Sequence, residues 1–315
     1  MTAPSVLVTG AGGFVGNALC QALLAADCRV YGATRAAGDL PLGTERVVWS
    51  GESAELANVP PVDIVVHLAA RVHVMHERAT DPLAEFRSVN VETTRKLASW
   101  AEGRGVKRFV FMSSVKVNGE ATEAGRAFSA DDVPAPEDAY AISKLEAEQA
   151  LRAVCSGSDM EFVVIRPPLV YGPGVQGNFR SMVQWVKRGV PLPLGAVSNR
   201  RSLVALDNLV SLTITCMEHP AAANQVFLVS DGEAVSTTEM LRKIALAYSV
   251  APRLLVVPRG WLLCAAGLLG KSSVVDRLLG SLEVNDAKAR DMLGWRPVVT
   301  MDEQLRKMAL DDARS

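Results

Sequence analysis

The sequence predicts an α/β protein with a doubly wound parallel sheet and a smaller α/β region in its C-terminal half. Near the N-terminus, a short β-branched run leads through a glycine-rich turn into a helical segment. Later apolar runs are nearly continuous, as strands covered by helices on both faces require. Helical segments alternate with these runs, which is typical of a parallel sheet. We expect the sheet domain to span residues 1–167 and the second region residues 168–315, with some segments returning to the sheet.

Composition excludes several classes of protein. The 315 residues carry a formal net charge of -1, so nothing indicates a nucleic-acid partner or an anionic membrane surface. The five cysteines are odd in number and scattered, which indicates neither a disulfide framework nor a zinc site. The N-terminus lacks the features of a secretory signal. The longest apolar run, residues 261–269, is too short to span a bilayer, and we expect a buried helix there. A cytoplasmic protein without membrane insertion is predicted.

The first expected strand, residues 6–9, ends in the turn GAGGFVG of residues 10–16, and a helix should follow over residues 17–26. Glycines let the backbone turn tightly and approach a pyrophosphate, whose charge then lies at the helix N-terminus. A glycine turn without a ligand is the alternative, but the flanking strand and helix favour a bound dinucleotide. The residues expected to bind it are Gly10, Gly13, Phe14, Val15 and Gly16.

The second expected strand, residues 29–33, should end beside the adenosine ribose of that dinucleotide. An acidic residue there would receive the 2′-hydroxyl of NAD. Thr34 and Arg35 follow instead, and Arg35 could pair with a 2′-phosphate. This favours NADP(H) over NAD(H), although an arginine at a strand end is often only solvated.

The run of residues 63–70 is expected to be a buried strand ending in His67, Leu68, Ala69 and Ala70. The small residues would let a cofactor pass across the backbone, so the last three are predicted to bind it. His67 is expected to be structural. His73 and His76 have a spacing that could suggest metal, but no carboxylate or cysteine cluster accompanies them, and no metal is predicted.

A long amphipathic helix is expected over residues 81–103, with an Asp-Pro pair at its start. Asn90 lies within it, either solvated or beneath a cofactor. The next buried strand, residues 108–112, ends at Ser113 and Ser114. Hydroxyl groups thus stand at a strand's carboxyl end, where ligands collect in open α/β sheets.

The expected helix of residues 137–150 contains Tyr140 and Lys144, which share one face. The ammonium can stabilise a phenolate and lower a pKa that is normally about 10. That would make a base usable near neutral pH. The spacing also occurs on many solvated helices, so its weight depends on the surrounding motifs. After a strand over residues 161–166, proline- and glycine-rich loops indicate a substrate pocket.

These motifs together resemble the extended short-chain dehydrogenase/reductase family, whose cofactor domain is of the Rossmann type. The later half resembles the nucleotide-sugar branch, in particular UDP-sugar 4-epimerases and 4-ketoreductases. The resemblance implies a homodimer through the helices that begin near Asp81 and Pro136. The later motifs that carry it are RPPLVYGPG at residues 166–174, RSLV at residues 201–204 ahead of Asp207, and LGWRP at residues 293–297.

The resemblance also implies roles for individual residues. Tyr140 would be the proton donor or acceptor, Lys144 would hold the nicotinamide ribose, and Ser114 would hydrogen-bond the sugar oxygen. Pro167 would join the cofactor site. The predicted contacts to the nucleotide diphosphate are Asn178, Arg201 and Arg277.

Two departures from the family pattern bear on substrate. Family 4,6-dehydratases carry Asp-Glu after the catalytic hydroxyl, whereas Val115 and Lys116 stand here, so a dehydratase is disfavoured. Asn118 and Gly119 replace the usual Tyr-Gly, and the pocket wall should therefore differ from that of common galactose-type epimerases.

Three functions stay open. Arg35 and the missing ribose carboxylate favour a 4-ketoreductase that forms a UDP-N-acetylquinovosamine type of nucleotide for surface polysaccharide synthesis. The alternative is a 4-epimerase of UDP-glucose or UDP-N-acetylglucosamine. A dinucleotide-sensing binding protein without turnover is the third, but the intact Ser114, Tyr140 and Lys144 argue against it, since a sensor needs no proton relay.

Overall fold

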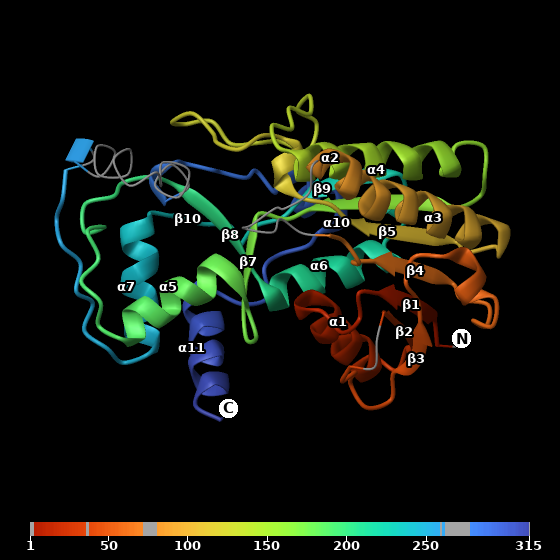
Figure 1. Ribbon diagram of the computed structural model, residues 1–315, viewed down its shortest axis with the longest axis horizontal. Helices are drawn as coiled ribbons and strands as arrows, with labels where there is room; N and C mark the ends of the chain where they lie inside the picture. Colours follow the sequence, from red (N-terminus) through yellow and green to blue (C-terminus); the bar gives the residue numbers. More distant parts are fainter. Residues whose placement is uncertain (1–2, 36–37, 72–80, 259, 262–277, 315) are drawn as a thin grey trace.

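A seven-stranded parallel sheet forms the centre of the computed structural model, which describes residues 3–35, 38–71, 81–258, 260–261 and 278–314. The strand order is β3-β2-β1-β4-β5-β6-β9, and every neighbouring pair is parallel (Figure 1). The predicted doubly wound sheet is confirmed. Its strands are β1 (Ser5–Thr9), β2 (Arg29–Thr34), β3 (Glu45–Val48), β4 (Ile64–His67), β5 (Arg108–Met112), β6 (Glu161–Arg166) and β9 (Gln225–Leu228).

Helices cover both faces of this sheet. Figure 1 shows α2, α3 and α4 over one face, and α1 and α6 over the other. The helices of this part are α1 (Phe14–Ala25), α2 (Pro82–Phe86), α3 (Thr93–Gly103), α4 (Ala139–Cys155), α6 (Leu206–Glu218) and α10 (Ala287–Leu293). Short helical turns are η1 (Ser53–Leu56), η2 (Arg87–Glu92), η3 (Val115–Val117) and η4 (Pro220–Ala222).

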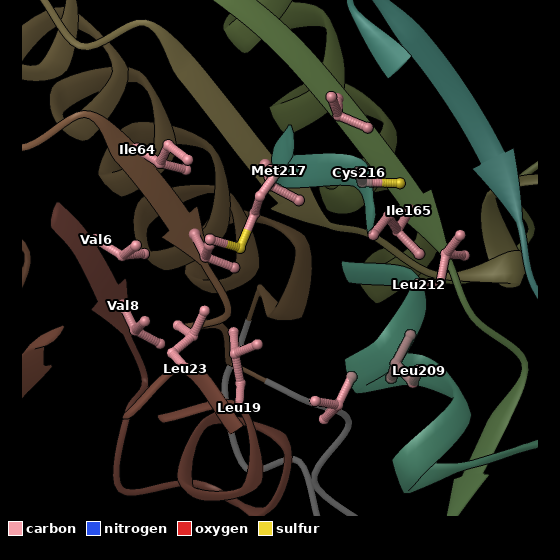
Figure 2. Packing of buried hydrophobic residues seen from close by; sticks show 14 of the residues in the cluster. Val6, Val8, Leu19, Leu23, Ile64, Ile165, Leu209, Leu212, Cys216 and Met217 are labelled. Carbon is pink, nitrogen blue, oxygen red and sulfur yellow. The ribbon is translucent and has the colours of Figure 1, made fainter. Parts of the chain in front are cut away.

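Every strand of the main sheet except β3 supplies side chains to two separate hydrophobic clusters. In β1, Val6 and Val8 pack toward α1 and α6, whereas Leu7 packs toward α3 and α4, because successive strand residues point to opposite faces. Figure 2 shows the first cluster, where Leu19 and Leu23 of α1 meet the strand side chains. Burying a side chain of this size stabilises the fold by about 1.5–3 kcal/mol. This packing holds the sheet rigid. The candidate site described below lies at the carboxyl ends of its strands.

A smaller region lies beside the main sheet and has its own hydrophobic cluster. It contains a three-stranded sheet of order β10-β8-β7 (Figure 1). Strand β9, from the C-terminal half of the chain, pairs with β6 of the main sheet. The division after residue 167 stays a prediction. The elements of the smaller region are β7 (Leu169–Tyr171), β8 (Arg201–Ala205), β10 (Ala234–Val235), α5 (Gly177–Lys187), α7 (Thr237–Ala247) and α11 (Met301–Asp312).

Some details differ from the expectation. Strands β3 and β9 have no counterpart among the predicted strands, since each has only four residues and β3 is largely exposed. The predicted helix of residues 81–103 is present, but η2 interrupts it as a π-helical turn. Trp261, at the start of the expected buried helix, is 74% exposed, and residues 262–269 lie outside the described part of the chain. Among the described residues, no helix is long and apolar enough to cross a bilayer.

Candidate functional site

The three predicted catalytic residues lie close together at the carboxyl end of the main sheet. Ser114 follows β5 directly and caps η3, where its Oγ accepts a hydrogen bond from the Lys116 N–H at 3.3 Å. Tyr140 is in the first turn of α4, and the Ser114 hydroxyl hydrogen-bonds its phenol. Lys144 follows one turn later on the same helix. The structure brings the three residues together, and their chemical roles stay predictions.

The start of α4 is fixed by Asp138. Its side chain caps the helix by accepting a hydrogen bond from the Ala141 N–H at 2.7 Å. A carboxylate at this position satisfies one of the free N–H groups of the first turn. Tyr140 is therefore held within the first turn, where the Phe86 ring meets its ring edge-on with centroids 5.9 Å apart.

The phenol of Tyr140 is a weaker acid than the spacing to Lys144 suggests. The pKa of Tyr140 is raised to about 12, mainly by burial and also by the charge of Asp138, and the hydrogen bond from Ser114 acts in the other direction. The pKa is therefore not lowered toward neutrality in the protein by itself, contrary to what the sequence led us to expect. Desolvation of the phenolate is the largest cause, and a nearby carboxylate adds to it. Proton abstraction near neutral pH requires a further positive charge beside the phenol.

Lys144 is a buried lysine with a lowered pKa. Its side chain is 2% exposed, and burial lowers its pKa to about 7, with Glu148 acting in the opposite direction. The ammonium nitrogen lies 4.1 Å from the centroid of the Phe111 ring, a cation–π contact. Lys144 can therefore gain or lose its proton near neutral pH.

His67 lies in the core beneath the site. Its Nδ1 is 2.6 Å from the Thr9 Oγ1, and its Nε2 is 3.1 Å from the Thr94 Oγ1. Burial lowers the pKa of His67 to about 3, and the charge of Lys144 contributes. The imidazole is thus neutral and bonded on both nitrogens, in agreement with the expected structural role.

Asn90 lies in the π-helical turn η2 and is buried. Its Oδ1 accepts from the Arg71 N–H at 2.8 Å, and its Nδ2 donates to the Arg71 carbonyl at 3.2 Å. The same Nδ2 donates to the Ser143 Oγ at 3.0 Å, and Ser143 donates to the Tyr140 carbonyl at 2.8 Å. Asn90 therefore joins the segment after β4 to the helix that carries Tyr140 and Lys144. Its predicted contact with a cofactor is untested.

The glycine turn after β1 can take a pyrophosphate. Gly10 has φ +70°, and a Cβ there would lie 2.9 Å from the Ala69 nitrogen. A Cβ on Gly16 would lie 2.1 Å from the Gly10 carbonyl oxygen, so only glycine allows α1 to pack this close. Gly13 is the N-cap of α1, and no side chain caps the helix. The free N–H groups of the first turn, at Phe14 and Val15, therefore suit an anionic group.

The other predicted cofactor residues follow the carboxyl ends of neighbouring parallel strands. Leu68, Ala69 and Ala70 come after β4, and the Ala69 N–H donates to the Thr9 Oγ1 at 3.3 Å. Arg35 is exposed just beyond β2, and Pro167 is buried just after β6. Because parallel strands end at one edge of the sheet, the glycine turn and these residues border the same edge. A nicotinamide dinucleotide fits this arrangement.

The residues predicted to hold the nucleotide diphosphate lie mostly in the smaller region. Asn178 is exposed in the first turn of α5, a helix without a side-chain cap. Arg201 opens β8, where its Nη1 donates to the Gly280 carbonyl at 3.1 Å and burial lowers its pKa. Arg277 lies outside the described residues, as do His73 and His76. The phosphate roles stay predictions.

A buried polar network beside the site was not predicted. The Glu148 carboxylate accepts from the Arg166 Nε at 2.9 Å, from its Nη2 at 2.6 Å, and from the Ser113 Oγ at 2.5 Å. The Arg166 Nη1 donates to the Asn118 Oδ1 at 3.1 Å. Glu148 follows Lys144 by four residues, which was the available sequence signal. Asn118 is 3% exposed and binds Arg166, and its expected effect on the pocket wall stays a prediction.

In the sequence, Lys116 stands out only as a departure from the dehydratase pattern. Its ammonium lies 2.7 Å from the Glu120 Oε1 and 2.6 Å from the Asp138 Oδ2. A cation therefore stands near the helix cap of α4 where dehydratases of the resembled family carry a carboxylate. An ammonium bound by two carboxylates is unsuited to act as the base of a dehydration, so this geometry, like the sequence, disfavours that reaction.

Comparison with known proteins agrees with the geometry of this site. Residues 6–230 match the model of the NAD dependent epimerase/dehydratase family. A UDP-glucose 4-epimerase of Vibrio cholerae is 46% identical over 309 residues, which cover 97% of this chain and 94% of that protein.

Two solved structures from Bacillus cereus share the fold. One is a UDP-N-acetylglucosamine 4-epimerase, with a TM-score of 0.80, 19% identity, and coverage of 98% of this chain and 99% of that one. The other is a UDP-glucuronic acid 4-epimerase in complex with NAD, with a TM-score of 0.78, 20% identity and the same coverage.

Proposed function

This chain belongs to the NAD-dependent epimerase/dehydratase family, as an enzyme of the extended short-chain dehydrogenase/reductase type, and we propose that it is a UDP-hexose 4-epimerase. The proposed substrates are UDP-glucose or UDP-N-acetylglucosamine. The similarity to the Vibrio cholerae UDP-glucose 4-epimerase carries the proposal, because it extends over 97% of the chain. This replaces the 4-ketoreductase preferred from the sequence with the alternative that stood beside it.

Ser114 and Tyr140 would handle the proton on O4 of the sugar. The Tyr140 phenolate accepts this proton while C4 loses a hydride and becomes a carbonyl carbon. Ser114, which already hydrogen-bonds the phenol, orients O4 toward it. When the keto sugar has turned its other face toward the site, Tyr140 returns the proton to O4 and the hydride comes back to C4. The configuration at C4 is thereby inverted without net oxidation.

NAD, when bound, would supply the hydride acceptor and donor for this reaction, and its oxidised nicotinamide would bring a positive charge to the site. Such a charge favours the phenolate and offsets the high pKa that burial imposes on Tyr140. The charged Lys144 would also favour the phenolate, since it lies one helical turn after Tyr140. Its ammonium is next to the Phe111 ring. The glycine turn and the residues after β4 would hold the dinucleotide.

We favour NAD over NADP for this chain, against the preference drawn from Arg35. An epimerase regenerates its cofactor in every cycle and gains nothing from a cofactor reserved for net reduction. The family description and the NAD bound to the Bacillus cereus UDP-glucuronic acid 4-epimerase support this choice. Arg35 is exposed beyond β2, where solvation alone accounts for an arginine.

Thermal unfolding in the presence of each cofactor tests the choice. We expect NAD at 100 times its Kd to stabilise the folded protein by about 2.7 kcal/mol. NADP at the same concentration should raise the melting temperature less, and Arg35→Ala should change the NAD shift little. A larger shift with NADP that Arg35→Ala abolishes would restore the original preference.

Incubation of the purified protein with NAD and UDP-glucose, or UDP-N-acetylglucosamine, tests the reaction itself. We expect interconversion of the gluco and galacto epimers, separated by chromatography, with no net change in absorbance at 340 nm. Tyr140→Phe should lose at least about 10²-fold in turnover, because positioned proton transfer typically contributes that much or more. Its NAD affinity should stay within about threefold of wild type.

Other outcomes would support the competing functions. Consumption of NADPH only with a 4-keto-6-deoxy derivative of UDP-N-acetylglucosamine would identify a ketoreductase. Tight dinucleotide binding without turnover of any of these sugars would favour the sensor. Retained epimerisation by Tyr140→Phe would refute the proposed proton transfer while leaving the reaction class intact.

A further inference from the structure

Glu148 forms a buried ion pair with Arg166, one helical turn after Lys144 on α4. Lys144 and Glu148 are one turn apart on α4, and their side chains are 2% and 1% exposed. Side chains at this spacing share one helix face, with Cβ atoms about 5–6 Å apart. Burying a charge is costly unless it is paired, so neighbouring groups must compensate a carboxylate at this position.

The partners of Glu148 connect α4 to the two strands that border the site. Arg166, the last residue of β6, binds both carboxylate oxygens. Ser113 follows β5 and donates to the carboxylate at 2.5 Å, next in sequence to Ser114. One carboxylate therefore fixes the helix that carries Tyr140 and Lys144 relative to the turn that carries Ser114.

The same carboxylate supplies the negative charge nearest to Lys144 along the helix. Burial acts to remove the Lys144 proton, and the charge of Glu148 acts to keep it. The other groups that face Lys144 give it no negative charge: His67 of β4 is neutral, Tyr140 is protonated, and Phe111 of β5 offers only its ring. Among the described residues, no carboxylate lies within 4 Å of the Lys144 nitrogen. Arg166 is bound to Glu148 and lies behind it.

We propose that Glu148 is a positioning residue for the C4 reaction, which keeps the Lys144 ammonium charged and holds it in register with Ser114 and Tyr140. The reaction named here rests on the proposed function. The effect on Lys144 does not, since it follows from the burial of both side chains and their spacing on α4. Glu148 itself need not touch substrate or cofactor.

A titration of Lys144 in the full-length protein tests the proposal without any substrate. Lysines labelled with ¹³C at Cε are followed by NMR, and the Lys144 resonance is identified by its absence in Lys144→Met. Ordinary lysines titrate near 10.4, so a midpoint near 7 is well separated from them. In Glu148→Gln we expect this midpoint to fall by about one pH unit, the size expected for losing one charge at this spacing.

Two further variants separate charge from structure. Ser113→Ala removes a hydrogen bond from the same carboxylate but leaves its charge, so its midpoint should move by less than a third of that shift. If Glu148→Gln does not fold, the double variant Glu148→Met with Arg166→Met removes both charges together, which buried ion pairs often tolerate. It should show a smaller downward shift, because the positive charge of Arg166 is lost together with the carboxylate. An unchanged midpoint in either Glu148 variant would overturn the proposal.

The activity of Glu148→Gln provides an independent readout. A midpoint that falls from about 7 to about 6 lowers the charged fraction of Lys144 at pH 7 from about one half to about one tenth. We expect kcat for epimerisation to fall about fivefold at pH 7, and its ratio to the wild-type kcat to recover toward pH 6. A loss that is equal at all pH values would indicate a merely structural role. If the wild-type protein has no epimerase activity, the proposed function fails and the NMR titration still stands.

Discussion

At the scale of single residues, the protonation of the site depends on charged side chains next to Tyr140 and Lys144. Tyr140 is affected by Asp138, Asp138 is bound by Lys116, and Lys144 is affected by Glu148. The charged neighbours Asp138, Lys116 and Glu148 are not themselves reacting groups in the proposed mechanism. Asp138 and Glu148 each change the proton affinity of a neighbour that takes part in the proposed reaction. The reactivity of Tyr140 is therefore set by side chains around it as much as by its own position.

Asp138→Asn keeps a capping side chain at the start of α4 but removes its negative charge. Asparagine caps helices about as well as aspartate, so the free energy of unfolding should change by less than about 0.5 kcal/mol. Removing the carboxylate charge should lower the pKa of Tyr140 from about 12. The phenolate absorbance at 295 nm after rapid jumps to alkaline pH measures this, with Tyr140→Phe subtracted as the blank. An unchanged or higher midpoint would show that Asp138 does not affect the phenol.

At the scale of elements, the turn between β1 and α1 is the most constrained part of the site. Gly10 brings the turn against the backbone after β4, and Gly16 brings α1 against the turn. These contacts place the N-terminus of the helix at the sheet edge, where a pyrophosphate would be bound. The packing of Leu19 and Leu23 against β1 holds the helix in that position (Figure 2).

Gly16→Ala should disrupt this arrangement, whereas Gly12→Ala should not. The Cβ at residue 16 would lie 2.1 Å from the Gly10 oxygen, so α1 must move away from β1. At residue 12 the Cβ would meet only the Thr34 Cγ2, at 3.6 Å. We expect Gly16→Ala to lower the free energy of unfolding in urea by about 1–3 kcal/mol and to weaken NAD binding. Equal stability of the two variants would contradict the packing argument.

The elements that the sequence predicts well are those whose signal is local. Strands β5 and β6 have the expected bounds because each is a short apolar run between polar residues. The glycine turn is equally local. The π-helical turn around Asn90 and the pairing of Glu148 with Arg166 join segments far apart in the chain, and neither spacing nor composition specifies such partners.

At the scale of the whole molecule, the residues predicted to bind cofactor and substrate are divided between the two parts of the chain. The main sheet supplies the glycine turn, the predicted catalytic residues and the segment after β4. The smaller region supplies Asn178 and Arg201 on α5 and β8 (Figure 1). Strand β9 returns to the main sheet and fixes the two parts to each other at β6. This arrangement suits a reaction in which the cofactor is retained while the sugar must turn.

His67 links the stability of the whole sheet to pH, since it lies where β1, β4 and α3 meet. Its pKa is about 3 in the folded protein and 6.5 in an unfolded chain, so only the unfolded chain binds the proton between these values. Stability from His67 is therefore complete above pH 6.5 and is lost as pH falls toward 3. We expect His67→Gln to reduce the slope of the unfolding free energy by about 1.4 kcal/mol per pH unit in this window, measured by urea titrations. His219→Asn is the matched control, because His219 lies outside the sheet core, and an equal change of slope in both variants would contradict the role of His67.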